Sequence, residues 1–324
     1  MHSHCNQSWN SNLKPLDKVS ALASILDLTE SELQSLSNNV DRYWIPGKLI
    51  PKKDGEPRPT NNALPPLKSV HQKIKSRILA RVKYPGFLKG GIYDPDNPRS
   101  TYSNAAVHCN SKILIEEDIS NFFPSIDCKV IYGVWRYFFN YSPEVSRILT
   151  KLTTYKGSAP QGWIPSSYLA NLAFWDLEQK LVNQLAEQGF RYSRYVDDVA
   201  VSSRQTKSRA EIQNAIQLVY KMFFSRGFKP KRKKHQIVSA DMAQKVTGLV
   251  VNGETPKFTR ERRNKIRAAV KRAEIAAELE AESSDHRKLW KSAASQVGNL
   301  RRSSPTQAEA LRVRLNAVKP VFLS

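Results

Sequence analysis

The chain has 324 residues, enough for one large domain or for several subdomains with a hydrophobic core. Lys and Arg number 51 against 29 Asp and Glu, and this net charge of +22 favours a polyanionic partner, by default nucleic acid. We find no signal-peptide pattern, membrane-length apolar run, lipidation signal or cysteine spacing typical of zinc or disulfide frameworks, so we expect a cytoplasmic protein that does not bind membranes.

The first hundred residues are predicted to form helices with a basic hairpin between them. Residues 13–40 contain two short helices, and residues 64–84 carry apolar side chains at helical spacing. Between these segments, Lys53-Asp54-Gly55-Glu56 has the form of a hairpin turn, which brings Lys53 and Arg58 to one loop. Such a loop suits the binding of a triphosphate, although a solvated basic turn is the alternative interpretation.

A strand that ends at an acidic residue follows a loop rich in Gly, Pro and Asn. The apolar run Ile113–Ile115 is typical of a buried strand, and Asp118 comes shortly after it. A carboxylate at the end of a strand is well placed to hold a metal ion. The alternative interpretation of Asp118 is a helix cap or a turn residue.

Two helices and a loop separate this strand from the next one. Residues 130–155 and 166–187 have helical apolar spacing, and the loop between them contains Gln161-Gly162. The segment from Phe190 to Ser203 then predicts a β-hairpin with Asp197 and Asp198 at its tip. Adjacent carboxylates repel each other, and a cation between them removes the repulsion, so the pair is a candidate Mg²⁺ site; a solvated Asp-Asp turn is the alternative.

The C-terminal third is strongly basic. After a helix over residues 209–226, residues 229–272 hold fourteen Lys and Arg but only three Asp and Glu. Within and beyond this stretch we expect a strand over 245–252, a helix over 259–282, a polar and partly helical connection, and a last helix opened by a capping box at Ser304. A solvated face is one interpretation of the charge, but the basic chain as a whole favours a phosphate-binding surface.

The order of these motifs resembles the palm of reverse transcriptases. Asp118 within Asp118–Ile126, then Gln161-Gly162, then Tyr195-Val196-Asp197-Asp198 match the motifs of that family in sequence order. The helix that follows Gln161-Gly162 contains the family's Leu-Ala-Asn-Leu as Leu169–Leu172, and the resemblance covers roughly residues 40–252.

Two further stretches resemble retron reverse transcriptases within that family. Asn104-Ala105-x-x-His108 matches their NAxxH signature, and Val246-Thr247-Gly248 matches their VTG motif. Two departures stand out: Trp163–Ser167 replaces the family's Pro-Thr-Ser-Pro, and Val196 stands where retron enzymes usually have Ala. Group II intron-like, diversity-generating and other defence-associated reverse transcriptases remain alternatives.

The resemblance implies an α+β, right-hand polymerase fold. We expect N-terminal helices and fingers over residues 1–106 and a palm with an antiparallel sheet over 107–252. The palm would include a helical fingers excursion at about 129–157, and a basic helical thumb would cover 253–324.

The implied activity is RNA-directed DNA polymerisation by in-line phosphoryl transfer with two Mg²⁺ ions. Asp118, Asp197 and Asp198 would hold the metals. The resemblance also implies residues on the nucleotide side of the site. Phe123 would be the steric gate, Gln161 and Gly162 would position the nucleotide, and Lys53 and Arg58 would bind its phosphates. Lys234 would donate a proton to pyrophosphate, a role for which neighbouring lysines compete.

A retron enzyme would also bind a structured noncoding RNA, the msr-msd transcript. It would prime from a guanosine 2′-OH and make a branched RNA–DNA product, msDNA. The candidate RNA-binding residues are Asn104, His108, Lys231, Arg232, Lys233, Val246, Thr247, Gly248, Arg260, Arg263 and Arg267.

The implied biology is bacterial antiphage defence with an effector or toxin protein, and template removal by host RNase H. Two alternatives stay open: a reverse transcriptase with 3′-OH priming, and a non-catalytic RNA-binding scaffold on a polymerase fold.

Overall fold

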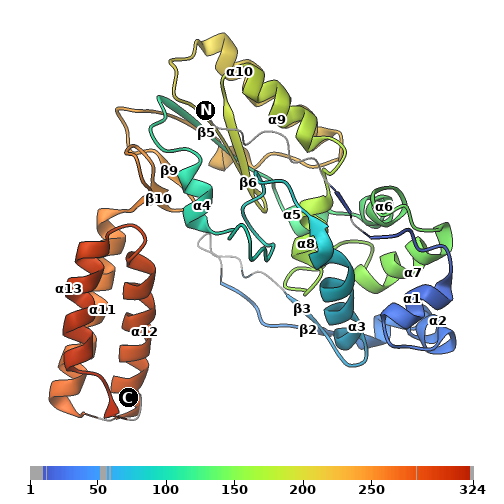
Figure 1. Ribbon diagram of the computed structural model, residues 1–324, viewed down its shortest axis with the longest axis horizontal. Helices are drawn as coiled ribbons and strands as arrows, with labels where there is room; N and C mark the ends of the chain where they lie inside the picture. The colour runs from blue at the N-terminus through green and yellow to red at the C-terminus, as the bar shows by residue number, and fades with distance from the viewer. Residues whose placement is uncertain (1–9, 12, 52–56, 58–59, 282, 322–324) are drawn as a thin grey trace. The chain divides into compact units, whose positions relative to one another are not determined.

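The computed structural model describes residues 10–11, 13–51, 57, 60–281 and 283–321, and the chain divides into two compact units (Figure 1). The first unit comprises residues 1–100 and 113–237, and the second comprises residues 101–112 and 238–324. The short segment 101–112 therefore belongs with the C-terminal part of the chain. The predicted division into fingers, palm and thumb places its boundaries elsewhere and stays a prediction.

The first unit is built around a four-stranded sheet with the strand order β6-β7-β5-β8. Strand β7 is antiparallel to both of its neighbours, and its register with β5 pairs Ser203 with Ile113 and Asp198 with Asp118. All residues of β7 after Asp198 are buried, which agrees with the central place of this strand. The strands are β5 (Ile113–Asp118), β6 (Arg191–Tyr195), β7 (Asp198–Ser203) and β8 (Gln236–Ser239).

The helices of the first unit share one hydrophobic core with the sheet. Helix α7 contacts α1, α2, α3 and α6, whereas α9 packs against β6 and α10 (Figure 1). The helices are α1 (Val19–Ile25), α2 (Glu30–Asn38), α3 (Leu67–Lys73), α5 (Phe122–Ser125), α6 (Cys128–Gly133), α7 (Pro143–Thr153), α8 (Ser166–Leu172), α9 (Glu178–Glu187) and α10 (Arg209–Phe224).

Short elements complete the first unit. The strands β1 (Asn10–Ser11) and β4 (Val82–Lys83) pair, as do β2 (Trp44–Pro46) and β3 (Asn61–Ala63). The irregular helices are η1 (Val40–Tyr43), η2 (Ile74–Ile78), η3 (Leu79–Arg81), η4 (Val134–Phe138) and η5 (Arg232–Lys234).

The second unit combines a small sheet with a helical bundle. Strands β9 (Lys245–Val246), β10 (Leu249–Val250) and β11 (Lys257–Phe258) form the sheet, and α4 (Thr101–Ala106) contacts β9 and β10. Helices α11 (Arg260–Leu279), α12 (Ser284–Leu300) and α13 (Pro305–Ala317) pack on one another. In the part of the chain that the structure describes, no helix has the length and apolar content needed to cross a bilayer.

The mixed α+β class and the antiparallel sheet are confirmed, but several element boundaries differ from the expected ones. The helix expected over 166–187 is two helices, α8 and α9, and the ring of Phe174 in the segment between them packs against the buried rings of Phe122 and Phe228. The helix expected over 64–84 ends at Arg81, and the one expected over 130–155 is interrupted after η4.

Three expectations for the C-terminal third were wrong in detail. The strand expected over 245–252 is the hairpin β9–β10, because Thr247 and Gly248 both have positive φ and turn the chain. The polar connection is the full helix α12, whose buried Ala293, Val297 and Leu300 recur at helical spacing. Helix α13 does begin after Ser304, but the side chain of this residue makes no capping hydrogen bond.

Candidate active site

Two of the three predicted carboxylates face each other across the sheet. Asp118 ends β5 and is 3% exposed, and Asp198 begins β7 as its direct register partner. Residues opposite each other in an antiparallel pair have Cβ atoms about 5 Å apart, and like charges in such a pair are destabilising. The two carboxylates therefore need a counter-charge between them.

The third carboxylate belongs to the turn that joins β6 to β7. Val196 and Asp197 form this turn, and Val196 has a φ of 62°, a left-handed conformation that is unusual for a β-branched residue. The carbonyl of Asp197 accepts a 3.1 Å hydrogen bond from the backbone N–H of Ile119, the residue after Asp118. This bond joins the turn to the end of β5, so Asp197 is fixed beside the other two acids.

A lysine supplies the counter-charge in this structure. The Nζ atom of Lys234, in η5, contacts Asp118 Oδ2 and lies 3.6 Å from Asp198 Oδ1. The backbone holds this basic segment in place, since the N–H of Lys231 donates to the Asp118 carbonyl at 2.7 Å. Lys231, Lys233 and Lys234 compete for the predicted role of proton donor, and the Lys234 ammonium lies against these two carboxylates.

The pKa values of the site reflect this concentration of charge. Withdrawal from water, a hydrogen bond with Asp118 and the charge of Asp197 raise the pKa of Asp198 to about 7, while the positive charge of Lys234 opposes the shift. Partial burial disfavours the charged form of Lys234, but its contacts with the acids outweigh burial and raise its pKa. The two shifts show that this site favours added positive charge.

The donor set suits a divalent cation such as Mg²⁺, which prefers carboxylate oxygens. Within the described ranges, no three Asp, Glu, His or Cys side chains already have the arrangement of a metal site. The carboxylates of Asp118 and Asp198 are instead satisfied by Lys234. A cation would compete with this ammonium for the same oxygens, and Asp118, Asp197 and Asp198 are the residues that could hold it.

A fourth acidic residue, Glu117, lies next to Asp118 in β5, and it was not predicted from the sequence. Glu117 is buried and lies 2.7 Å from His235 Nδ1 through its Oε1 atom. Tyr220 donates to the other oxygen of Glu117 at 3.1 Å. Burial raises the pKa of Glu117, and these partners oppose the shift. Its position beside Asp118 at the acidic end of β5 was the available signal, and its contacts tie α10 and the residue after η5 to β5.

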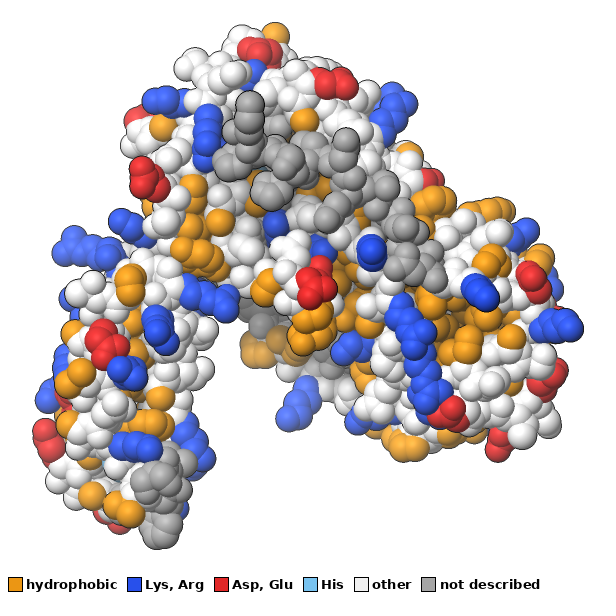
Figure 2. Space-filling model, viewed as in Figure 1, with side chains coloured by type: hydrophobic (Ala, Val, Ile, Leu, Met, Phe, Trp, Pro, Cys, Tyr) orange, Lys and Arg blue, Asp and Glu red, His pale blue; other side chains and the backbone are white. Residues whose placement is uncertain are grey.

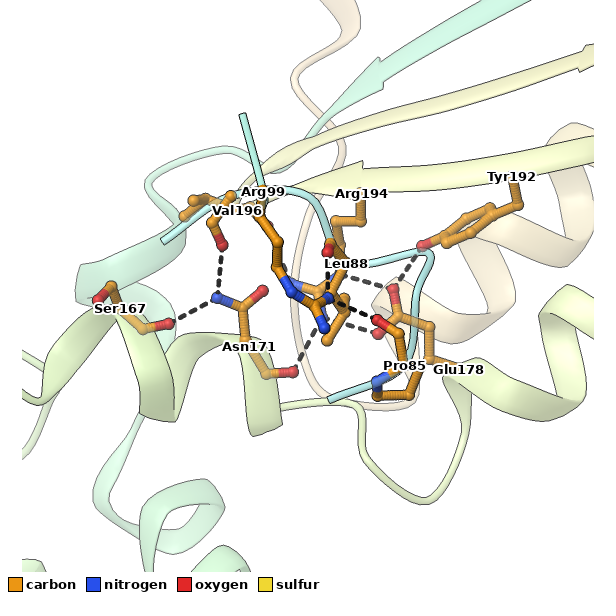
Figure 3. Close-up of polar contacts among 10 residues, drawn as sticks. Pro85, Leu88, Arg99, Ser167, Asn171, Glu178, Tyr192, Arg194 and Val196 are labelled. Carbon is orange, nitrogen blue, oxygen red and sulfur yellow. Dashed lines mark hydrogen bonds and ion pairs between the residues drawn. The ribbon is translucent and has the colours of Figure 1, made fainter. Parts of the chain in front are cut away.

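A buried arginine beneath the turn was also not predicted (Figure 3). The guanidinium of Arg194 donates to the carbonyl of Val196 at 2.9 Å and pairs with Glu178, with both side chains fully buried. Its only sequence signal was an arginine among the residues that directly precede the Asp197-Asp198 turn.

The predicted nucleotide-binding residues are only partly covered by the structure. Gln161 is half-buried, and Gly162 has a φ of 89° and lies near Thr60 at the base of the β2–β3 hairpin. The next residue, Trp163, stacks parallel to Trp44 of β2. Lys53 and Arg58, predicted in the same hairpin, lie outside the described residues.

The predicted steric gate lies on α5. The ring of Phe123 is half-buried and packs against the core of the first unit, next to Phe122. Asn121, with a φ of 49°, turns the chain from β5 into this short helix. Phe123 thus lies on the short helix that directly follows the strand carrying Asp118.

The second unit brings the two retron-like motifs together. Thr247 donates to the carbonyl of Thr101 at 2.9 Å, so the β9–β10 turn is bonded to the start of α4. The side chains of Asn104 and His108 are buried, as is Val246, whereas Gly248 is exposed at the turn. Among these motif residues, Gly248 in the β9–β10 turn is the one exposed to solvent.

The basic candidates are mostly exposed. Arg260 and Arg267 are exposed on α11 and Arg263 is half-buried, while Arg232 and Lys233 are exposed on η5. Figure 2 shows Lys and Arg side chains spread over the visible face of the bundle formed by α11, α12 and α13.

Comparison with known proteins identifies the family. The model of the reverse transcriptase (RNA-dependent DNA polymerase) family matches residues 50–269. The retron Se72 reverse transcriptase of Salmonella heidelberg (strain 579083-10) is 32% identical over 314 residues, which are 96% of this chain and 82% of that protein. The retron Ec48 reverse transcriptase of Escherichia coli is 26% identical over 320 residues, 95% of this chain and 77% of that protein.

A solved structure supports the fold alone. Telomerase from Candida albicans, in complex with a TWJ fragment of telomeric RNA, aligns with a TM-score of 0.50 at 13% identity, over 96% of this chain and 64% of that one. The predicted right-hand polymerase fold is thereby confirmed. The chain therefore belongs to the reverse transcriptase family and, within it, to the retron-type bacterial reverse transcriptases, which are RNA-directed DNA polymerases.

Proposed function

We propose that this polymerase copies a cognate structured noncoding RNA into msDNA, a branched RNA–DNA molecule primed from a guanosine 2′-OH. The observation that carries the catalytic part of this proposal is the register of Asp118 opposite Asp198, with Asp197 in the adjoining turn. The retron part is supported by similarity to retron enzymes over nearly the whole chain.

The three aspartates would hold the metals at the end of the sheet. Two Mg²⁺ ions, when bound, supply a lowered pKa for the attacking hydroxyl and neutralise the charge of the leaving pyrophosphate. Asp118, Asp197 and Asp198 would together supply the carboxylate oxygens that hold the ions. Lys234, displaced from the carboxylates that it contacts in this structure, would be available to donate a proton to pyrophosphate.

The nucleotide would enter between the carboxylates and the fingers hairpin. Phe123 would exclude a ribose 2′-OH by steric clash and so select dNTPs. Gln161 and the backbone of Gly162 would position the nucleotide, and the proximity of Gly162 to Thr60, the residue before β3, supports this placement. Lys53 and Arg58, predicted in that hairpin, would bind the triphosphate.

The RNA would bind the basic surface of the chain by shape and by phosphate contacts, as expected for A-form RNA. Arg260, Arg263 and Arg267 of α11 would contact the phosphates, together with the exposed basic side chains of η5. Asn104 and His108 are buried, which supports a role in shaping the exposed turn at Gly248 rather than in touching the RNA themselves.

The cellular partners follow from the retron assignment and are proposals as well. The enzyme would work in the bacterial cytoplasm in antiphage defence, together with an effector protein. Host RNase H would remove the copied template.

Isolation of the nucleic acid bound to the purified protein tests this proposal. We expect a species that resists linearisation until a 2′–5′ debranching enzyme is added, with cDNA that maps to one structured RNA. Abundant linear cDNA that extends from ordinary 3′-OH primers would instead favour the alternative, a reverse transcriptase with another priming mode. Failure of the wild type to incorporate dNTPs with any divalent metal would favour an RNA-binding scaffold.

A further inference from the structure

A fully buried ion pair lies directly beneath the turn that carries Asp197. Arg194 Nε donates to Glu178 Oε1 at 2.6 Å, and a terminal nitrogen donates to Glu178 Oε2 at 2.7 Å. Tyr192 donates to the same carboxylate at 2.6 Å. Both charged side chains are 0% exposed, so each depends on the other for its counter-charge.

The same guanidinium reaches the strained turn. Its other terminal nitrogen donates to the carbonyl of Val196 at 2.9 Å (Figure 3). A β-branched residue in the left-handed region is strained and persists only where its surroundings over-determine the conformation. Arg194 is one such determinant, because it fixes the peptide that joins Val196 to Asp197.

The guanidinium also reaches the helix that follows the predicted nucleotide-binding loop. Arg194 donates to the carbonyl of Asn171 at 2.9 Å, close to the C-terminal end of α8. Asn171 in turn donates through Nδ2 to the carbonyls of Gly90 at 3.0 Å and Ser167 at 2.8 Å. The turn, the helix after Gln161-Gly162 and the loop at Gly90 are thus joined in one hydrogen-bonded network.

The loop closes over the outer edge of β6. The backbone carbonyl of Arg194 accepts a 2.8 Å hydrogen bond from the Lys89 N–H, and the Arg194 N–H donates to the Phe87 carbonyl at 2.9 Å. A Cβ atom at Gly90 would lie 2.8–2.9 Å from the Tyr195 ring, so only glycine allows this approach.

A second buried arginine fixes the conformation of this loop. The side chain of Arg99 is 2% exposed and pairs with Asp94 at 2.8 Å. It also donates to the carbonyls of Pro85 and Leu88 (Figure 3). A third bond goes to the carbonyl of Tyr84. The loop is therefore a preformed support for the hairpin.

We propose that Arg194 is a positioning residue for DNA synthesis, which orients Asp197 and Asp198 by fixing the Val196 carbonyl. Since these acids are metal ligands only in the function proposed above, the role of Arg194 rests on that function. Stability alone does not require the pair, because apolar residues often replace a buried ion pair without loss. The five N–H donors of the Arg194 guanidinium explain how one side chain holds the Glu178 carboxylate and the carbonyls of Val196 and Asn171 in fixed geometry.

A pair of variants separates positioning from stability. Arg194→Met leaves Glu178 buried without its counter-charge, and we expect a lower melting temperature. In Arg194→Met/Glu178→Gln both charges are gone, while Gln still accepts the Tyr192 hydrogen bond, and the melting temperature should return to within a few degrees of wild type. The Val196 carbonyl still lacks its donor in this double variant.

Three measurements on the full chain then decide. In the double variant we expect kcat for RNA-templated synthesis to fall roughly 100-fold with little change in the KM for dNTPs. We expect Mn²⁺ affinity, read from the paramagnetic resonance of free Mn²⁺, to fall about tenfold or more. Arg226→Met is the matched control, because Arg226 also pairs with an aspartate, Asp176, and a backbone carbonyl, that of Ala173, away from the turn.

Recovery of kcat and Mn²⁺ affinity together with the melting temperature would overturn the proposal. If the double variant does not fold, Arg194→Lys tests the proposal instead, because Lys keeps the positive charge beside Glu178 but lacks the several directed donors of the guanidinium. A kcat near that of the wild type would then contradict the positioning role, and a reduced kcat would support it. Asp197→Asn/Asp198→Asn distinguishes failure of the underlying function, since unchanged Mn²⁺ affinity in that variant would remove the metal role itself.

Discussion

Asp118 and Asp198 are direct partners in the β5–β7 register, and the Lys234 ammonium contacts the first and lies 3.6 Å from the second. The positive charge of Lys234 balances two carboxylates that would otherwise repel each other. In the function proposed above, a divalent cation would compete with the ammonium for these oxygens, and Lys234 would then be available to the phosphates of a nucleotide. Lys234 would therefore act both before and after a cation binds.

Replacement of Lys234 tests this role. We expect Lys234→Ala to lower kcat for dNTP incorporation about 100-fold or more, the usual effect of losing a general acid. Lys233→Ala is the matched comparison, because Lys233 is the exposed neighbour on the same short helix. Single-turnover kinetics with saturating RNA would give both values. Equal losses of kcat in the two variants would show that only the charge of η5 matters.

Phe123 is predicted to select the sugar of the incoming nucleotide. A smaller side chain in Phe123→Val would leave room for a 2′-OH, so we expect the preference for dTTP over UTP to fall roughly tenfold or more. The ratio of kcat/KM for the two nucleotides on one RNA template gives the answer. Phe138→Leu, at another half-buried ring of the same unit, serves as the control. An unchanged ratio in Phe123→Val would place the gate elsewhere.

The arginines of α11 are predicted to bind RNA phosphates. Arg260→Ala/Arg263→Ala/Arg267→Ala should weaken RNA binding and reduce the slope of log affinity against log salt by roughly one unit for each phosphate that an arginine no longer neutralises. Filter binding at several salt concentrations measures this slope. Arg312→Ala is the control in the same bundle, since Arg312 is engaged by Glu309 through two hydrogen bonds. An unchanged slope in the triple variant would contradict the assignment.

The buried His71 predicts a pH-dependent stability. Burial lowers its pKa to about 4, against the opposing effect of the hydrogen bond between Nε2 and the Leu152 carbonyl, which is 2.7 Å long. The unfolded chain, with a His pKa near 6.5, binds more protons between these two values, so stability falls as pH drops below about 6.5. At pH 5 this loss is about 2 kcal/mol.

Denaturant unfolding of wild type and His71→Gln at pH 7.5 and pH 5 isolates that effect. Other groups titrate equally in both proteins, and Gln retains a donor for the Leu152 carbonyl. We expect the wild type to lose about 2 kcal/mol more than the variant on acidification. Identical losses in the two proteins would mean that His71 is charged or exposed in the folded state.

The sequence was sufficient to find the carboxylates but not their support. Asp118 ends a strand that begins with an apolar run, and Asp197-Asp198 stand at the start of the buried strand β7, so both patterns can be read locally from the sequence. The Arg194–Glu178 pair joins β6 to the start of α9 across a separation of 16 residues, so no local pattern revealed it. Helix α12 was underestimated because its few buried residues lie among many polar ones.

Mg²⁺-dependent dNTP incorporation on an RNA template, by the wild type and by Asp197→Asn/Asp198→Asn, tests the proposed metal site most directly. We expect the variant to lose activity by roughly 1000-fold or more while its RNA affinity and melting temperature stay near wild type. Glu187→Gln, at the exposed end of α9, is expected to behave as wild type. Incorporation by the double variant at a rate close to that of the wild type would contradict the account.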